Sequence, residues 1–229
     1  MNPPDDDLAH TSALAITIGR QPGSGGSDLG RAIATRLGIA YLDQEILREA
    51  ARQLGVQDQS LTDRGERVTK FWERLLRAFA LGAPEETYTA YPERSEVVAS
   101  IPDVDLFNAQ SRAMRELVQL GDSVVIGHAG FYVLRDHPCH VKVFVHAKAE
   151  LRAERISRER NVSIADARIM VRQADDERRR FIEHISGCEW TNVRNYDLCI
   201  DSGRVSNALA EEMIVRLVNE RRQQCAGAR

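Results

Sequence analysis

A run of glycines near the start of the chain could bind phosphate through its backbone. Four glycines follow one another closely, between an apolar segment and a segment with helical spacing. Glycine lets such a turn fold back so that several N–H groups point inward, and the N-terminus of the next helix attracts anions. The pattern therefore predicts a phosphate site, to which we assign Gly19, Gly23, Ser24, Gly25, Gly26, Ser27 and Asp28.

This loop differs from the common phosphate-binding motif G-x-x-x-x-G-K-S/T. Five residues separate Gly19 from Gly25, and Gly26 stands where the motif has lysine. None of the chain's three lysines lies near the loop, so we expect Arg20 to supply the missing positive charge. Ser27 keeps the hydroxyl position that contacts Mg²⁺ in such loops. The alternative is a glycine-rich turn between a strand and a helix that binds no ligand.

A second candidate site is a segment rich in arginine. Between Lys148 and Arg180 the sequence has ten basic and seven acidic residues. Phosphoryl transfer needs in-line positioning and positive charge around the phosphate oxygens. Helical spacing places Asp175 one turn before Arg178, and Asp176 one turn before Arg179. This predicts two carboxylate–arginine pairs. The alternative is a solvated helix with surface ion pairs. The catalytic candidates are Arg20, Arg155, Arg172, Arg178 and Asp175, and Arg152 is assigned to the donor nucleotide.

Two further candidates follow apolar segments that read as buried strands. Asp43 could hold Mg²⁺ through water or orient an acceptor, or it could simply cap the end of its strand. His128 follows a strand at the edge where α/β proteins bind ligands, although a structural role is the simpler interpretation. The other histidines lack the spacing of metal ligands, which argues against a metalloenzyme. No G-x-S-x-G or G-x-G-x-x-G pattern supports a hydrolase or a dinucleotide site.

Strands alternating with helices must position these residues. Apolar, β-branched runs predict strands at 14–18, 39–43, 123–127, 141–145 and 196–201. Helical spacing covers 29–37, 44–54, 64–81, 106–120 and 205–221, and 149–184 reads as a helical hairpin with Ser163 capping its second helix. This alternation predicts an α/β protein whose parallel sheet has helices on both faces. The irregular segment from 56 to about 105 reads as an insertion over the core.

Composition restricts the class of protein further. We expect a single domain over 14–222, preceded by a disordered acidic tail at 1–13. The net charge of −3 and the pI near 6.1 argue against a nucleic-acid binder. The four cysteines form no CxxC pair, so we read them as reduced thiols without a zinc site or a disulfide. With no signal-peptide pattern and no long apolar window, we expect a cytoplasmic protein without a membrane partner.

Taken together, several segments resemble the cytidylate kinase-like family of nucleoside monophosphate kinases. They are Ile16–Gly26, Tyr41–Leu47, Val124–Gly130, Tyr132–Asp136, Asp175–Arg178 and Tyr196–Leu198. The likeness spans roughly residues 14 to 206. A loop without lysine is typical of this family, whereas His128 stands where the family more often has arginine.

The resemblance implies a fold, a reaction and further site residues. It implies the three-layer P-loop kinase fold with a parallel sheet, a helical acceptor-binding insertion at about 56–110 and a helical lid at about 150–185. It also implies ATP and Mg²⁺ as cofactors, and an arginine–aspartate–arginine cluster that holds the acceptor. The acceptor candidates are Asp43, His128, Asp176 and Arg179.

The function that follows is ATP-dependent transfer of a phosphoryl group to a nucleoside monophosphate, most plausibly CMP or dCMP. One alternative keeps the donor site and uses another small metabolite as acceptor. Another is a nucleotide-binding regulatory or degenerate kinase-like module without turnover, which the missing lysine and His128 motivate. The sequence leaves the oligomeric state open.

Overall fold

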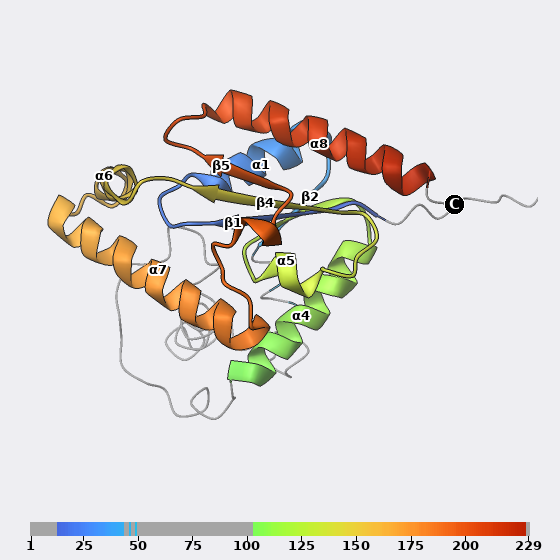
Figure 1. Ribbon diagram of the computed structural model, residues 1–229, viewed down its shortest axis with the longest axis horizontal. Helices are drawn as coiled ribbons and strands as arrows, with labels where there is room; N and C mark the ends of the chain where they lie inside the picture. Colours follow the sequence, from blue (N-terminus) through green and yellow to red (C-terminus); the bar gives the residue numbers. More distant parts are fainter. Residues whose placement is uncertain (1–12, 44–45, 47–48, 50–102, 228–229) are drawn as a thin grey trace, which may run out of the picture.

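Five parallel strands form the centre of the molecule (Figure 1). The computed structural model describes residues 13–43, 46, 49 and 103–227. The strands are β1 (Ala15–Arg20), β2 (Ala40–Leu42), β3 (Ser123–Ile126), β4 (His140–His146) and β5 (Leu198–Asp201). Their order in the sheet is β2-β3-β1-β4-β5. Because all five are parallel, their carboxyl ends meet at one edge, where this class of sheet binds ligands.

The central strand is apolar because it is buried on both faces. Ile16 of β1 aligns with Val124 of β3 and Val141 of β4, and all three side chains are inaccessible to solvent. Gly19 and Arg20 extend β1 beyond the expected 14–18 and pair with Phe144 and Val145. Arg20 is therefore fixed by the sheet ladder rather than by a loop.

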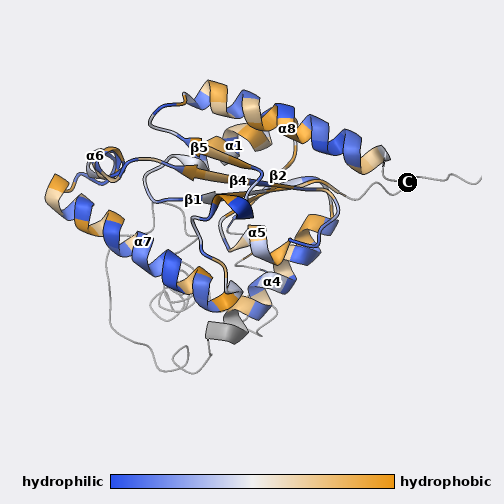
Figure 2. Ribbon diagram, in the orientation of Figure 1, coloured by the Kyte–Doolittle hydropathy of each residue, from blue (hydrophilic) through white to orange (hydrophobic). Residues whose placement is uncertain are grey.

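Helices cover both faces and complete the three layers (Figure 1). On one face, α1 (Gly26–Leu37) and α8 (Asn207–Gly227) share an apolar core with the sheet. On the other, α4 (Asp103–Gln119) packs beside the short α5 (Gly130–Val133). The sequence did not predict α5, since four residues are too few for a helical period to show. The remaining helices are more hydrophilic along their length (Figure 2).

These remaining helices form the predicted hairpin. Helix α6 (Ala149–Arg160) ends at Asn161, whose left-handed conformation turns the chain. Helix α7 (Ile164–Ser186) begins at Ser163, whose side chain accepts a hydrogen bond from the Asp166 amide at 3.1 Å. The two helices enclose a small apolar core of their own. Both the hairpin and its Ser163 cap confirm the sequence-based prediction.

Three expectations lie outside the described residues. They are the acidic tail, apart from residue 13, the helix at 64–81 and nearly all of the insertion at 56–105. Only residues 46 and 49 of the helix expected at 44–54 are described, and both are helical.

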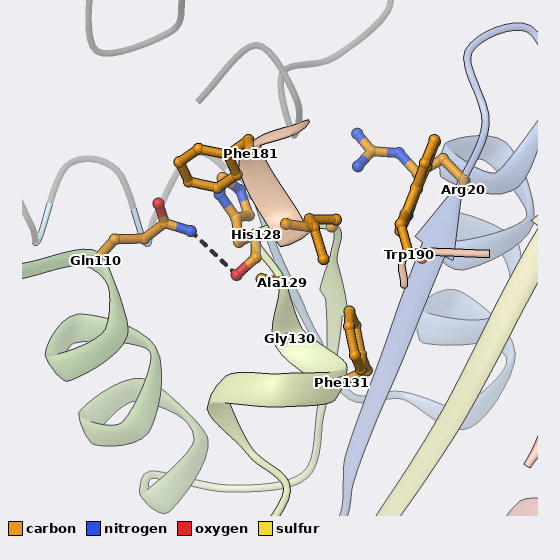
Figure 3. Close-up of a pocket in the computed structure, with 11 residues that line it drawn as sticks. Arg20, Gln110, His128, Ala129, Gly130, Phe131, Phe181 and Trp190 are labelled. Carbon is orange, nitrogen blue, oxygen red and sulfur yellow. Dashed lines mark hydrogen bonds between the residues drawn. The ribbon is translucent and has the colours of Figure 1, made fainter. Parts of the chain in front are cut away.

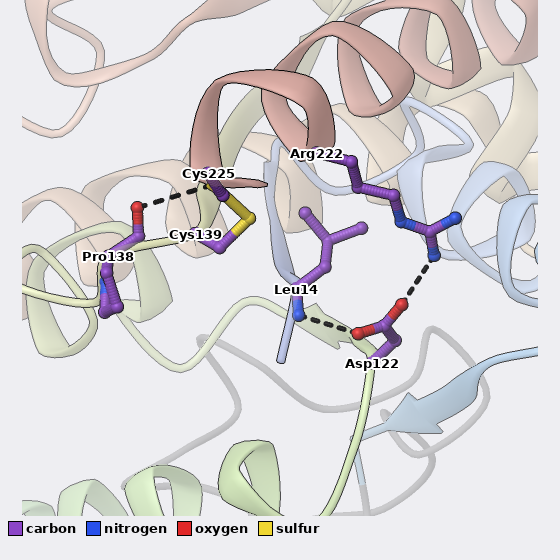
Figure 4. The surroundings of a disulfide bond; sticks show 6 residues. All are labelled: Leu14, Asp122, Pro138, Cys139, Arg222 and Cys225. Carbon is purple, nitrogen blue, oxygen red and sulfur yellow. Dashed lines mark hydrogen bonds and ion pairs between the residues drawn. A yellow bond between two sulfur atoms is a disulfide. The ribbon is translucent and has the colours of Figure 1, made fainter. Parts of the chain in front are cut away.

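The prediction of four reduced cysteines was wrong for two of them. Cys139 and Cys225 form a disulfide with their Cα atoms 5.8 Å apart, while Cys188 and Cys199 are free (Figure 4). The partners are 86 residues apart, and sequence spacing alone does not reveal a pair that the fold brings together. The expectation of a cytoplasmic protein thus loses the support of reduced thiols. No helix in the described ranges is long and apolar enough to cross a membrane.

Candidate functional site

The glycine-rich loop joins β1 to α1 at the carboxyl edge of the sheet. Gly23 and Gly25 have φ angles of +70° and +77°, which side chains rarely tolerate. A Cβ on Gly23 would lie 2.7 Å from the Arg152 carbonyl oxygen, so packing also demands glycine there. A Cβ on Gly25 would meet nothing within 4 Å, because this side of the loop is open. The open, N–H-rich turn before a helix is the arrangement that holds phosphate.

Arg20 explains why the loop has glycine where related loops have lysine. Its side chain is only 3% exposed, and its Nε donates to Ser27 Oγ at 3.1 Å. A Cβ on Gly26 would lie 2.6 Å from the Arg20 Cβ. A lysine at position 26 would therefore collide with Arg20. The structure thus has a buried arginine next to the position of the usual lysine, bonded to the serine that we assign to magnesium. That Arg20 takes over the role of the lysine stays a prediction.

Arg152 is the most heavily bonded of the predicted arginines. It lies buried on α6 and donates to both Asp175 carboxylate oxygens, at 3.1 and 2.7 Å. It also donates to the backbone oxygens of Ala147 and Pro22, at 2.9 and 3.2 Å. A bidentate pair with two further acceptors fixes the guanidinium in one orientation. Arg152 thereby joins both helices of the hairpin to the glycine loop.

Two more arginines donate to carbonyl oxygens of the same loop. Arg155 contacts the Gly23 oxygen at 3.3 Å and the Ser202 side chain at 3.0 Å. The Ser202 hydroxyl donates in turn to the Ser24 oxygen at 2.6 Å. The buried Arg178 donates to the Arg20 oxygen at 3.2 Å. These bonds rigidify the loop and place positive charge behind it, which strengthens its attraction for phosphate.

Four predicted residues are not brought into this cluster. Asp176 and Arg179 form an exposed ion pair at 2.7 Å, which confirms one of the two predicted carboxylate–arginine pairs. The other is wrong, because Asp175 turns to Arg152 on the neighbouring helix instead of to Arg178. The other two are exposed: Asp28 in the first turn of α1, and Arg172 of α7, which forms no hydrogen bond or ion pair with another residue within 13–43 or 103–227.

Asp43 and His128 meet at the carboxyl ends of β2 and β3. The His128 Nε2 lies 3.2 Å from the Asp43 Oδ1, and both side chains are buried. Burial first, and then the nearby Asp43 charge, raise the pKa of Tyr41 to about 12, so its phenol stays protonated. Residues 127 to 129 all have positive φ angles, including +52° at His128. Such strain is stored mainly at functional sites.

A pocket opens between these two groups of residues (Figure 3). Sequence analysis missed four of its lining side chains: Gln110 of α4, Phe131 of α5, Phe181 of α7, and Trp190. Their type gave no signal, because aromatic residues and a lone glutamine are usual in any core. Arg20 lines the same pocket. The pocket and the phosphate loop therefore share one cation.

The loop fits a nucleoside triphosphate with Mg²⁺. The buried Ser24 Oγ has no partner within the described parts of the chain, and the open side of Gly25 leaves room for an anion. The described residues contain no group of three His, Cys, Asp or Glu side chains that could hold a metal. Magnesium is commonly held by few protein groups together with substrate phosphates, and Ser27 would be such a group.

Comparison with known proteins places this site in a family context. The model of the cytidylate kinase-like family matches residues 15–204. A cytidylate kinase of Methanopyrus kandleri is 25% identical over 203 residues, covering 85% of this chain and 87% of that protein. A cytidylate kinase of Pyrobaculum aerophilum is 24% identical over 194 residues, covering 84% and 86%.

A solved structure shares the fold. The crystal structure of an uncharacterized protein from Eubacterium ventriosum superposes with a TM-score of 0.62 at 20% sequence identity. The alignment covers 90% of this chain and 98% of that one. At this identity the likeness bears on the fold alone.

Proposed function

We propose that this chain, which belongs to the cytidylate kinase-like family, transfers the γ-phosphoryl group of ATP to a nucleoside monophosphate of the CMP or dCMP type. The observation that carries the proposal is the shared position of Arg20. It lines the pocket beside the loop, bonds to Ser27, and accepts through its backbone oxygen a bond from Arg178. One cation thus faces both the donor loop and the neighbouring pocket.

The donor half of the site binds and orients phosphate. Backbone N–H groups from Gly23 to Ser27 would hold the donor phosphates, and the Ser27 hydroxyl would help to hold Mg²⁺, which would supply positive charge to offset that of the phosphates. Arg152 and Arg155 keep the loop in shape through its carbonyl oxygens. Because these bonds are made within the protein itself, they reduce the reorganisation needed at the moment of transfer.

The acceptor half positions the attacking phosphate. The pocket lies at the carboxyl ends of β1 and β3, so an acceptor in it would direct its phosphate toward Arg20. His128 lines the pocket, and its contact with the buried Asp43 joins the strained turn to the end of β2. In-line geometry of acceptor and donor is the main requirement of phosphoryl transfer.

A coupled assay of ADP release tests the proposal. The purified protein is mixed with ATP, Mg²⁺ and one of CMP, dCMP, UMP, AMP or GMP. We expect acceptor-dependent ADP release, fastest with CMP or dCMP. ATP binding without turnover of any acceptor would contradict the proposal. It would favour a nucleotide-binding regulatory module without catalytic activity. Turnover with another metabolite but with none of these nucleotides would support the assignment of the donor site and reject a nucleoside monophosphate as the acceptor.

A further inference from the structure

Gln110 lies across the pocket from the phosphate-binding arginine. Figure 3 shows Gln110 and Arg20 on opposite sides, with Phe181 and Trp190 also lining the space. A nucleotide has a matching arrangement, because its base and its negatively charged phosphate lie at opposite ends. With the phosphate at Arg20, the base would lie at Gln110.

The Gln110 carboxamide has a defined orientation. Its Nε2 donates to the His128 backbone oxygen at 3.3 Å. The reverse orientation would set two oxygen atoms against each other, so the nitrogen must face His128. The oxygen Oε1 is then left as an acceptor, and it is buried without a hydrogen-bond partner among the described residues. A buried polar atom of this kind costs about 1–3 kcal/mol until a donor reaches it.

We propose that Gln110 is a specificity-determining residue whose Oε1 accepts a hydrogen bond from the exocyclic amino group of the acceptor base. This inference rests on the proposed function and names the feature of the acceptor that is recognised. Cytosine presents an amino group where uracil presents a carbonyl oxygen. A carbonyl facing Oε1 would leave two acceptors opposed and unsatisfied, so the site rejects it.

The rest of the pocket suits a flat ring. Phe131 and Trp190 are buried, whereas Phe181 on α7 is only partly buried. Aromatic side chains provide an apolar surface against which a base can stack. The free space is about 20 Å³, which holds about one water molecule. A base can enter only if a lining side chain moves, and Phe181 is the least buried of the three aromatic residues.

Gln110→Met tests the assignment, because methionine has a similar length and cannot accept a strong hydrogen bond. We expect the ratio of kcat/KM for CMP to that for UMP to fall at least tenfold, with the rate for UMP little changed. The matched control is Gln119→Met, an exposed position on the same helix, which should keep the wild-type ratio. Melting temperatures of both variants report whether the fold is retained.

A second measurement needs no variant. The monophosphate of a pyrimidin-2-one nucleoside lacks the amino group but keeps the ring, and the wild type should use it at least tenfold less well than CMP. Equal use of the two acceptors, or a Gln110→Met protein with the wild-type CMP/UMP ratio, would overturn the assignment.

Failure of this inference can be separated from failure of the proposed function. If the wild type phosphorylates no nucleoside monophosphate, the proposed function fails, and calorimetric binding of CMP and UMP then decides the role of Gln110. Tighter binding of CMP that is lost in Gln110→Met would retain Gln110 as the base-reading residue. Equal binding of the two nucleotides would reject it.

Discussion

The two edges of the sheet differ in what their polar groups do. At the amino edge, residues just before three strands are tied down: Asp122 accepts from the Leu14 amide at 2.7 Å and pairs with Arg222 of α8, and Cys139 is bonded to Cys225 (Figure 4). At the carboxyl edge, the turn at residues 127–129 is strained, and buried acceptors such as Gln110 Oε1 have no partner among the residues that the structure describes.

This difference indicates that the amino edge of the sheet serves mainly stability, whereas the carboxyl edge carries the candidate site. The amino edge fastens the last helix to the core with a covalent bond and an ion pair. The carboxyl edge brings buried arginines close together and has buried polar atoms without hydrogen-bond partners among the described residues. Both features lower the stability of the folded protein. Substitutions at the two edges should therefore affect different measurements.

The strongest test of this contrast is Arg20→Ala at the carboxyl edge. Removing a preorganised cation from a phosphoryl-transfer site should lower kcat by about 10³-fold. Arg36→Ala removes a cation from the last turn of α1, where Arg36 pairs with Glu211 at 3.0 Å on the surface, and should leave kcat near the wild-type value. Similar rates for Arg20→Ala and the wild type would remove Arg20 from the site.

Two neighbouring aspartates on α7 sharpen the contrast between buried and exposed charge. Asp175→Ala leaves the buried guanidinium of Arg152 without its carboxylate, which should cost about 3 kcal/mol of unfolding free energy and lower turnover as the loop loosens. Asp176→Ala breaks an exposed pair and should cost less than about 1 kcal/mol. Urea unfolding of both variants measures the difference. Equal losses would mean that Arg152 does not depend on Asp175.

At the amino edge, Cys225→Ser should reduce stability without reducing turnover. Losing a bond that closes a loop of this length typically costs about 2–4 kcal/mol, and the 86-residue separation places this disulfide among long loops. Chemical unfolding with and without a thiol reductant provides the control, since reductant should destabilise the wild type and leave the variant unchanged. A parallel fall in kcat would show that the two edges are coupled.

At neutral pH the smallest expected effect concerns His140, which contacts the Thr17 hydroxyl at 2.8 Å inside the sheet. Burial first, and then the Lys142 charge, lower its pKa to about 3, against about 6.5 in the unfolded chain. The unfolded chain therefore binds the proton more tightly, so stability falls as pH decreases from about 6.5 toward 3, by up to about 1.4 kcal/mol per pH unit.

His140→Gln keeps a polar group beside Thr17 and removes this titration. Its unfolding free energy, measured at pH 7, 5.5 and 4, should therefore fall less steeply than that of the wild type. Identical slopes would show that His140 is protonated as readily in the folded protein as in the unfolded chain.

Local sequence pattern predicted the parts of the molecule that depend on neighbouring residues. The glycine loop between a strand and a helix, the helical hairpin and the Ser163 cap all follow from residue type and spacing within a few positions. The role of Arg20 in place of lysine was inferred from composition and stays a prediction.

Contacts between distant segments could not be predicted in this way. Asp175 has Arg178 at helical spacing and still pairs with Arg152, because α6 packs against α7. The steric exclusion of lysine by Arg20, the role of Gln110 and the Cys139–Cys225 bond likewise depend on how the sheet and its helices assemble. Spacing predicts which partners are possible, and packing selects among them.

The most direct test of the account is to follow the phosphorus atoms of the reaction by ³¹P NMR. ATP, Mg²⁺ and CMP are incubated with the wild-type protein, and with the Arg20→Ala protein as a control. We predict that the ATP γ-phosphate signal is replaced by the β-phosphate signal of CDP, in step with formation of ADP, and only with the wild type at comparable times. Release of inorganic phosphate in place of CDP, or unchanged ATP, would contradict phosphoryl transfer to a nucleotide at the carboxyl edge of this sheet.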